Sequence, residues 1–544
     1  MQSIEFDCKA SFVPVSDTGY FSNLVIDYLN NNENLKPFFD FELNNEGLLA
    51  AIEKRRTFPV DREKLVSVIQ EQYKDLELSK ITENNIISIL QENTFTVCSA
   101  HQPNLMTGYM YFFYKIIHSV KMAQHLKRLS PNDNFVPVFF IGSEDNDFDE
   151  LGHFKYNGKL YQWATEQTGA VGMMQSDENL QNLIESLFSI LGPLGINEKS
   201  LKQTIRKAYK SGNSIAKAKQ IFINELLGFM GVLAIDFNEH SLKDSFKNII
   251  KKEILDPKAF ELVKEASSQL QENYKAQAFF RPINLFYLNN GIRERIEKVD
   301  NQFVVMNSEL IFSDKEIELE IDEKPEHFSP NVILRGLYQE SILPNIAFIG
   351  GGSEVAYWMQ LKKVFEYYNV FYPMIILRQS GLIMDEKTDE LRLKLDLNIK
   401  DIFLRTNELV YNLIEKEKVK NWSLANYKNI IELWEEEIKE KLSKLDNNLN
   451  VSVISSLTKV RKQFDVLEKK INHSIKIKKE IEMNRIQSFK DHAFPNDSLQ
   501  ERYETFMPFY LEYGSRVFKD ILANCSIFGD QFLILTYRTF QLET

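Results

Sequence analysis

Apolar residues along the chain fall into two alternating patterns. Short apolar runs rich in β-branched and aromatic residues predict buried strands. These runs lie at 95–100, 136–141, 231–237, 283–288, 345–349, 372–377 and 531–537. Longer segments with apolar residues three and four apart predict helices. They lie at 63–76, 110–122, 199–229, 241–271 and 499–513. Strands that alternate with helices in this way are typical of an α/β fold with a mostly parallel sheet.

The pattern divides the chain into four parts. The predicted parts are an N-terminal helical part of the core at 1–90, an α/β core with insertions at 91–383, an antiparallel coiled coil at 384–494, and a segment returning to the core at 495–544. Two stretches within the core, 303–307 and 317–322, alternate in polarity and predict a small antiparallel insertion.

The third part has the regular spacing of a coiled coil. From Met374 to Phe494 there is no proline, and the only glycine is Gly381. Apolar residues then step by three and four at Leu424, Tyr427, Ile431, Trp434 and Ile438, and again at Val453, Leu457, Val460, Phe464, Leu467 and Ile471. A polar turn at 446–448 separates the two series, which predicts an antiparallel helical hairpin. A homodimer built on this hairpin is expected, and an intramolecular role is the alternative.

Composition narrows the class of protein. The chain has 544 residues, 44% of them hydrophobic, and a net charge of −12, which argues against general nucleic-acid binding. Its three cysteines, Cys8, Cys98 and Cys525, form neither a zinc motif nor a disulfide framework, as expected in a reducing cytosol. No signal pattern and no apolar run of about 20 residues is present, so we expect no membrane contact and a cytoplasmic location.

Polar residues follow the strand predicted at 95–100. His101 and Gln102 come first and are candidate substrate-binding residues. Thr107 and Gly108 fall where the next helix is expected to begin, and helix N-termini favour anions. Lys115, about two turns into that helix, has a side chain long enough to reach back. We therefore assign Thr107, Gly108 and Lys115 to a nucleotide or phosphate site.

A cluster of carboxylates follows the strand predicted at 136–141. Its members are Glu144, Asp145, Asp147, Asp149 and Glu150. Their mutual repulsion has to be offset by a substrate ammonium, a divalent metal carrying a nucleotide, or arginines from elsewhere. We assign Glu144, Asp145 and Asp147 to catalysis and Asp149 to substrate binding. The spacing does not fit a calcium-binding EF-hand loop.

Three glycines, Gly350, Gly351 and Gly352, follow the strand predicted at 345–349. Successive glycines let backbone N–H groups approach an anion closely. The helix expected next carries three candidate substrate-binding residues, Glu354, Tyr357 and Gln360. Two more candidates, Arg335 and Gln339, are four residues apart, so one helical face presents both, and arginine suits bidentate capture of a carboxylate or phosphate.

These groups together suit a ligase that binds ATP, activates a carboxylate and presents an amine. The acidic loop would hold the amine or a Mg²⁺ ion, and the glycine turn with Arg335 would hold phosphate or carboxylate. Catalysis would then consist of positioning and charge stabilisation. The hypothesis requires the acidic loop, the Thr107–Gly108 bend, the glycines and Arg335 to meet in one pocket.

Three stretches resemble a known family, the bacillithiol biosynthesis protein BshC. AHQPNLMTGYMYFFYK at 100–115 is similar to the family's GQQAGLLTGPLYTIYK, and SEDNDFDE at 143–150 is similar to GEDHDFDE. SPNVILRGLYQESILPNIAFIGGGSEVAYWMQLK at 329–362 is similar to SPNVLLRPLYQD…LPTVAYVGGPGEIAYWAQLK. The chain departs from these patterns at several positions. His101 replaces a Gln, Pro103 an Ala, Tyr109 a Pro, Asn146 a His, Gly336 a Pro, and Gly352-Ser353 a Pro-Gly.

The resemblance implies a Rossmann-like nucleotide-binding core, a dimerising coiled coil, and a ligase that adds cysteine to the amine of glucosamine-malate. It also implies a nucleotide pocket near the last core strand, where Arg378, Ser380 and Gly381 would lie, in competition with the Thr107 site. Whether ATP is split to ADP or AMP stays open. Two other functions stay open as well: a different nucleotide-dependent adenylating transferase, and a coiled-coil scaffold.

Overall fold

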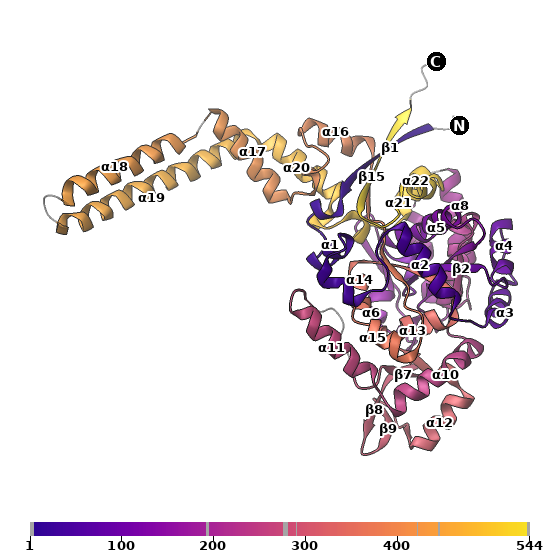
Figure 1. Ribbon diagram of the computed structural model, residues 1–544. Coiled ribbons are helices and arrows are strands. Elements are labelled where there is room, and N and C mark those ends of the chain that lie inside the picture. The colour runs from indigo at the N-terminus through magenta and orange to yellow at the C-terminus, as the bar shows by residue number, and fades with distance from the viewer. Residues whose placement is uncertain are drawn as a thin grey trace. The chain divides into compact units, whose positions relative to one another are not determined.

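The computed structural model describes residues 5–191, 195–275, 281–289, 291–421, 423–443 and 447–540. They form two compact units. One unit consists of Met1–Ile383 and Gln500–Thr544, and the other of Met384–Leu499. Sheets flanked by helices make up the first unit, and the second is helical (Figure 1). Among the described residues, no helix is both long and apolar enough to cross a membrane.

A five-stranded parallel sheet forms the centre of the first unit. Its order is β13 (Met374–Leu377), β12 (Asn345–Gly350), β2 (Thr94–His101), β3 (Asn134–Ile141) and β6 (Leu233–Asp236). Every neighbouring pair is parallel. This sheet confirms the predicted α/β class. Numbered along the chain, the strands lie in the order 5-4-1-2-3, so the direction of winding reverses between β2 and β12. Ligands of such sheets bind at this reversal, beyond the carboxyl ends of the strands.

Helices cover both faces of the sheet because alternate residues of its strands point to opposite sides. In β3, Phe139 and Ile141 pack in one apolar cluster with α5 (Tyr111–Leu129) and α9 (Ile215–Leu227). Their neighbours Val138 and Phe140 pack in a second cluster. That cluster includes side chains of α10 (His240–Leu255), α13 (Val332–Ile342), α14 (Gly352–Trp358) and α15 (Lys362–Tyr368).

The two ends of the described chain pair with each other. Strand β1 (Glu5–Pro14) runs antiparallel to β15 (Gln531–Phe540), and β15 also pairs with β14 (Gly381–Met384) (Figure 1). The strand predicted at 531–537 is confirmed in β15, whereas β1 was not predicted. The residues of β1 differ in exposure along the strand. Polar residues among them interrupt the apolar run that would have predicted a strand here.

A second, antiparallel sheet is inserted between β6 and β12. Its order is β10 (Ile311–Phe312), β9 (Gln302–Val305), β8 (Ile292–Val299), β7 (Leu285–Asn289) and β11 (Phe328–Pro330). The predicted antiparallel insertion is therefore present, but its strand at 317–322 is wrong. Those residues lie in α12 (Asp314–Glu323), where Ser313 and Glu316 form a capping box and Ile317 and Ile321, one turn apart, are buried.

Two predicted long helices are each two helices. Residues 199–229 contain most of α8 (Ile196–Ala208) and α9, which are separated near Gly212, a residue with φ of +85°. Residues 241–271 contain α10 and α11 (Ala259–Gln271), which are separated at Pro257. Proline and a left-handed glycine both interrupt helical hydrogen bonding.

The remaining helices of the first unit lie around these sheets. They are α1 (Asn23–Leu29), α2 (Asn45–Arg56), α3 (Arg62–Tyr73), α4 (Lys80–Ser88), α6 (Phe148–Leu151), α7 (Glu178–Ile190), α21 (Met507–Tyr513) and α22 (Arg516–Asn524). A small hairpin consists of β4 (His153–Tyr156) and β5 (Lys159–Gln162).

The second unit is an antiparallel coiled coil, as predicted. Its helices are α16 (Glu386–Lys394), α17 (Thr406–Asn421), α18 (Ala425–Ser443), α19 (Asn447–Lys478) and α20 (Glu480–Ala493). Lys428 Nζ lies 2.7 Å from Glu468 Oε2, and farther along α18 Glu435 pairs with Arg461. The residue number rises along α18 from one pair to the next while it falls along α19, so the two helices are antiparallel. Asp446 of the predicted turn lies outside the described residues.

A buried carboxylate supports the end of α13 and the start of β12. Glu340 Oε1 accepts hydrogen bonds from Gln339 Nε2 at 2.7 Å and from Asn345 Nδ2 at 2.8 Å. Only 1% of Glu340 is exposed, and burial raises its pKa to about 7, against the opposing influence of the Arg55 guanidinium. Because Glu340 accepts a hydrogen bond from the Gln339 amide, it restrains the orientation of that side chain.

We expect Glu340→Gln to flatten the pH dependence of stability between about pH 4.5 and 7. The folded protein keeps Glu340 protonated up to about pH 7, whereas the unfolded chain loses this proton near the ordinary value of 4.5. Ionisation of Glu340 therefore lowers the free energy of unfolding as the pH rises through this window. At about 1.4 kcal/mol per pKa unit the effect is at most about 3.5 kcal/mol.

Urea unfolding midpoints measured at several pH values test this expectation. Glu63→Gln, on the exposed side of α3, is the matched control. A slope that is the same in Glu340→Gln and in the unaltered protein would contradict the assignment.

Candidate functional site

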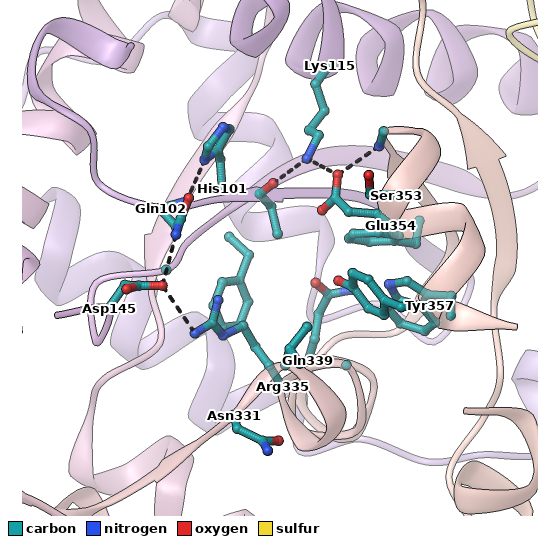
Figure 2. A pocket seen from close by; sticks show the side chains of 18 of the residues that line it. His101, Gln102, Lys115, Asp145, Asn331, Arg335, Gln339, Ser353, Glu354 and Tyr357 are labelled. Atoms are coloured by element: carbon teal, nitrogen blue, oxygen red, sulfur yellow. Dashed lines mark hydrogen bonds and ion pairs between the residues drawn. The ribbon is translucent and has the colours of Figure 1, made fainter. Parts of the chain in front are cut away.

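A cavity of about 800 Å³ opens at the reversal of the central sheet, beyond the ends of β2, β3 and β12. The structure brings many of the predicted site residues to its wall. They are His101, Gln102, Lys115, Asp145, Arg335, Gln339, Gly351, Gly352, Glu354, Tyr357 and Arg378. In Figure 2, Asp145 and Gln102 face Glu354 and Tyr357 across the cavity, and Arg335 and Gln339 reach in from α13.

The end of β2 supplies one edge of the cavity. His101 Nδ1 accepts the backbone N–H of Gln102 at 2.7 Å, and its Nε2 lies 2.8 Å from the Tyr111 hydroxyl. Gln102 Nε2 donates to Asp145 Oδ2 at 3.1 Å. Loss of hydration lowers the pKa of His101 well below its usual value, and nearby cations, first among them Lys115, lower it further. The imidazole is therefore neutral at physiological pH.

Asp145 is the member of the acidic loop that reaches the cavity most directly. Burial alone would raise its pKa, but the charge of Arg335, the hydrogen bond from Gln102 and the charge of Arg293 bring it below the ordinary value. Arg335 Nη2 lies 3.9 Å from Asp145 Oδ2. Asp145 is therefore an ionised acceptor between an amide and a guanidinium. Glu150 also lines the cavity, and burial and then the charge of Asp147 raise its pKa.

The other predicted acidic residues do not line this cavity. Glu144 forms a buried ion pair with Lys243 of α10 and accepts the Ser329 hydroxyl at 3.1 Å. Asp147 caps α6 by accepting the backbone N–H of Glu150 at 3.1 Å. Asp149 is exposed on the same short helix. Charge repulsion in the loop is thus relieved by Lys243 and Arg335, and the catalytic and binding roles assigned to these three residues stay predictions.

The glycine turn after β12 is held by its own helix. Glu354 Oε2 accepts the Gly351 N–H at 2.7 Å and pairs with Lys115, whose Nζ also donates to the Ala100 carbonyl at 2.8 Å (Figure 2). The Gly351 N–H is therefore already engaged by a carboxylate. Gly350 completes β12 and lies outside the cavity wall.

The prediction that a helix begins at Thr107–Gly108 is wrong. The residues Met106, Thr107 and Gly108 have φ of +49°, +69° and +72°, so a left-handed bend separates β2 from α5, which begins at Tyr111. A left-handed φ is energetically costly for a β-branched residue such as Thr107. The residue types therefore did not predict this bend. Thr107 is buried and does not line the cavity.

Three other predicted residues lie away from the cavity wall. Gln360 is buried and donates to Ser267 Oγ. Ser380 Oγ accepts from Arg378 Nη1 at 3.1 Å, and the Gly381 N–H donates to Glu501 Oε2 at 2.9 Å. Both lie next to Arg378, which reaches the cavity while its Nη2 bonds Glu501 Oε1 at 2.7 Å.

Sequence reasoning missed a group of arginines that line the cavity: Arg281, Arg293, Arg295 and Arg502. Arg293 and Arg295 both come from β8, and alternate residues of a strand share one face. Arg293 is tethered to Ser329 Oγ at 3.0 Å and Asn146 Oδ1 at 3.1 Å, and burial lowers its pKa to about 10. Arg293 and Arg295 are two residues apart and follow the strand predicted at 283–288. This spacing is the feature of the sequence that could have predicted that both line one site.

The cavity wall carries more positive than negative charge. The carboxylate of Glu354 is neutralised by Lys115, and Asp145 faces Arg335. Within the described ranges, Arg281 and Arg295 form no ion pair, so their charge is available to an anionic ligand. Within the same ranges no group of three or more His, Cys, Asp and Glu residues could hold a metal ion. The cavity thus combines the carboxylates of Asp145 and Glu150 with an arginine-rich wall.

Two family models cover almost the whole chain. Residues 9–379 match the model of Bacillithiol biosynthesis BshC, N-terminal Rossmann-like domain. Residues 381–537 match the model of Bacillithiol biosynthesis BshC, C-terminal coiled-coil domain. The central parallel sheet and the helical hairpin are the elements that these descriptions name.

Curated relatives carry the name "Putative cysteine ligase BshC". The protein of Christiangramia forsetii is 34% identical over 96% of this chain and 98% of its own length. That of Flavobacterium psychrophilum is 35% identical over 93% of this chain and 95% of its own. A more distant relative from Bacillus cytotoxicus is 25% identical over 90% of this chain and 94% of its own.

The two family models and the relatives agree with the resemblance carried by the stretches at 100–115, 143–150 and 329–362. Many of the matching residues in these stretches, among them Gln102, Asp145 and Arg335, line the cavity at the reversal of the sheet. The chain belongs to the BshC family of bacillithiol biosynthesis.

Proposed function

We propose that the protein is a ligase that joins the carboxyl group of cysteine to the amine of glucosamine-malate at the expense of ATP. The observation that carries this proposal is the cavity itself, whose wall contains ionised Asp145 together with several arginines. An amide-forming ligase has to hold one amine and several anions together, and this wall offers a partner for each. The names of the relatives support the same activity.

The reaction needs an activated carboxyl group because hydroxide is a poor leaving group. A carboxylate oxygen of cysteine attacks phosphorus of ATP, which gives an acyl phosphate and ADP or an acyl adenylate and pyrophosphate. The amine of the acceptor then attacks the acyl carbon, an amide forms, and phosphate or AMP leaves with the bonding electrons. The amine loses one proton in this step, and a base has to take it.

Asp145 and Glu150 suit the amine side of this reaction. Ionised Asp145 accepts a hydrogen bond from the amine and orients it. Glu150 has a raised pKa and lines the same cavity, so it is the better proton acceptor for the step in which the amide forms. Holding the two reactants together in this way supplies most of the catalytic effect in such reactions.

The arginines suit the anionic side. Arg281, Arg293 and Arg295 would bind the two carboxylates of the malate group, since guanidinium pairs with carboxylate through two parallel hydrogen bonds. Arg335 lies beside Asp145 and would stabilise a negative charge that develops on the acyl group. Arg378 and the Gly351–Gly352 turn lie on the opposite side and would face the phosphates of ATP with its Mg²⁺ ion.

We expect Asp145→Asn to lower kcat/KM about 100-fold because the amine loses its charged acceptor.

Arg295→Ala should raise KM for the acceptor about tenfold and leave KM for cysteine unchanged, because it removes one charge-assisted hydrogen bond. The assay incubates enzyme with ATP, cysteine and glucosamine-malate, measures the thiol product by mass and records whether phosphate or pyrophosphate is released. Arg206→Ala, on the exposed side of α8, is the matched control.

A folded protein that forms no product with any nucleotide would overturn the proposal. Release of pyrophosphate with another carboxylic acid, but not with cysteine, would favour a different adenylating enzyme.

We also propose that the coiled coil joins two copies of the chain. Apolar side chains on α18 face solvent at helical spacing: Tyr427 is 57% exposed, Ile430 50%, Leu433 64% and Trp434 61%. Ile431, in contrast, is 8% exposed within its own unit. The predicted apolar series on α18 therefore contains more surface than one hairpin buries. A second copy that presents the same stripe would cover it symmetrically.

Leu433→Glu combined with Trp434→Glu should convert the dimer to a monomer, because it places two carboxylates in the proposed interface. Sedimentation equilibrium measures the molecular mass directly. Glu432→Lys lies on another side of α18 and is the control for a change of charge alone. A protein that is monomeric before substitution would refute this arrangement.

A further inference from the structure

His101 and Tyr111 form a pair at the wall of the cavity. His101 ends β2 and Tyr111 begins α5, and the two rings stack with centroids 5.3 Å apart and planes 19° apart. The BshC pattern that this stretch resembles has glutamine at the position of His101. The pair is therefore a feature of this chain rather than of the family pattern.

Backbone geometry fixes the tautomer of His101. The Gln102 N–H can only donate, and it lies 2.7 Å from His101 Nδ1, so Nδ1 carries no proton. The imidazole is neutral because burial and the charges of Lys115, Lys219 and Arg378 oppose protonation. Its one proton is therefore on Nε2, which lies 2.8 Å from the Tyr111 hydroxyl oxygen.

This tautomer determines what Tyr111 offers to a ligand. The tyrosine oxygen accepts the hydrogen bond from His101 Nε2–H, so the phenolic proton has to point elsewhere. Burial raises the pKa of Tyr111 to about 12, and the phenol keeps its proton at physiological pH. Tyr111 lines the cavity, with the Arg378 guanidinium 5.1 Å from the centre of its ring. Arg502, which lines the same wall, adds to the positive potential.

We infer that Tyr111 is a ligand-binding residue whose hydroxyl donates a hydrogen bond to an anionic oxygen, and that His101 is the positioning residue that aims this donor. The anionic oxygen belongs to a carboxylate or to a phosphate group. This inference rests on the proposed function for the identity of the ligand, since cysteine supplies a carboxylate and the nucleotide supplies phosphates. No proton is transferred, and His101 acts only through Tyr111.

Three substitutions separate the two roles. Tyr111→Phe removes the donor and keeps the ring. His101→Gln places an amide N–H near the former position of Nε2, whereas His101→Asn reaches only as far as Nδ1. Asparagine therefore keeps the contact with the Gln102 N–H and loses the contact with Tyr111. Isothermal titration with L-cysteine and, separately, with pyrophosphate compares the two sources of the anionic oxygen.

We expect Tyr111→Phe to weaken binding of one of these two probes about tenfold, which identifies the ligand group that Tyr111 contacts. His101→Asn should weaken binding of the same probe several-fold, and His101→Gln should restore affinity to within about twofold of the unaltered protein. Added to Tyr111→Phe, His101→Asn should cost nothing further, because both substitutions remove one interaction. Equal losses in His101→Asn and His101→Gln would indicate a structural role and overturn the inference.

A spectroscopic measurement tests the tautomer without any ligand. Long-range ¹H–¹⁵N spectra of the histidine-labelled protein, compared with His101→Gln for assignment, should show His101 with a protonated Nε2 and a bare Nδ1. The opposite tautomer overturns the inference, as does a failure of the unaltered protein to bind either probe. If Tyr111→Phe binds a probe more weakly and the unaltered protein forms no ligated product, the inference is supported and the proposed ligase reaction is refuted. Unchanged binding with normal product formation would do the reverse.

Discussion

One buried cation, Lys115, connects the two halves of the central sheet where the winding reverses. From the second turn of α5 it reaches the Ala100 carbonyl near the end of β2 and the Glu354 carboxylate at the start of α14. Glu354 in turn holds the Gly351 N–H. The cavity is open at this point because adjacent strands send their connections to opposite faces. Because Lys115 is buried and forms both hydrogen bonds, this contact stabilises the geometry of the cavity wall.

Electrostatic imbalance decides what the cavity can hold. The carboxylates that could have made it acidic are used within the protein: Glu144 by Lys243, Glu354 by Lys115 and Glu501 by Arg378. Asp145, flanked by Gln102 and Arg335, and Glu150 remain at the cavity wall. The loop that looks strongly acidic in sequence thus lies beside a site whose net potential is positive, and this potential suits carboxylate and phosphate ligands.

The sequence predicted the sheet well and the site in part, for different physical reasons. Buried parallel strands are continuous apolar runs, so the strand at 136–141 could be recognised without knowledge of its neighbours. Residues directly after such strands, such as Gln102 and Asp145, are carried to one edge by topology alone. Arg281 and Arg295 belong to an antiparallel insertion, and their place in the cavity depends on how that second sheet packs against the first. Which of two neighbouring carboxylates, Glu144 or Asp145, turns inward depends on the position of Lys243 about 100 residues later, and no local pattern carries that information.

The pairing of β1 with β15 has a consequence for how the protein is made. Residues 5–14 leave the ribosome early, yet their hydrogen-bonding partners at 531–540 are synthesised after the whole coiled coil. Until then β1 exposes an unpaired edge, which is the kind of surface that associates wrongly with other chains. The β1–β15 contact has a very long sequence separation and can form only after the rest of the chain has been made, which is the kind of contact that slows folding.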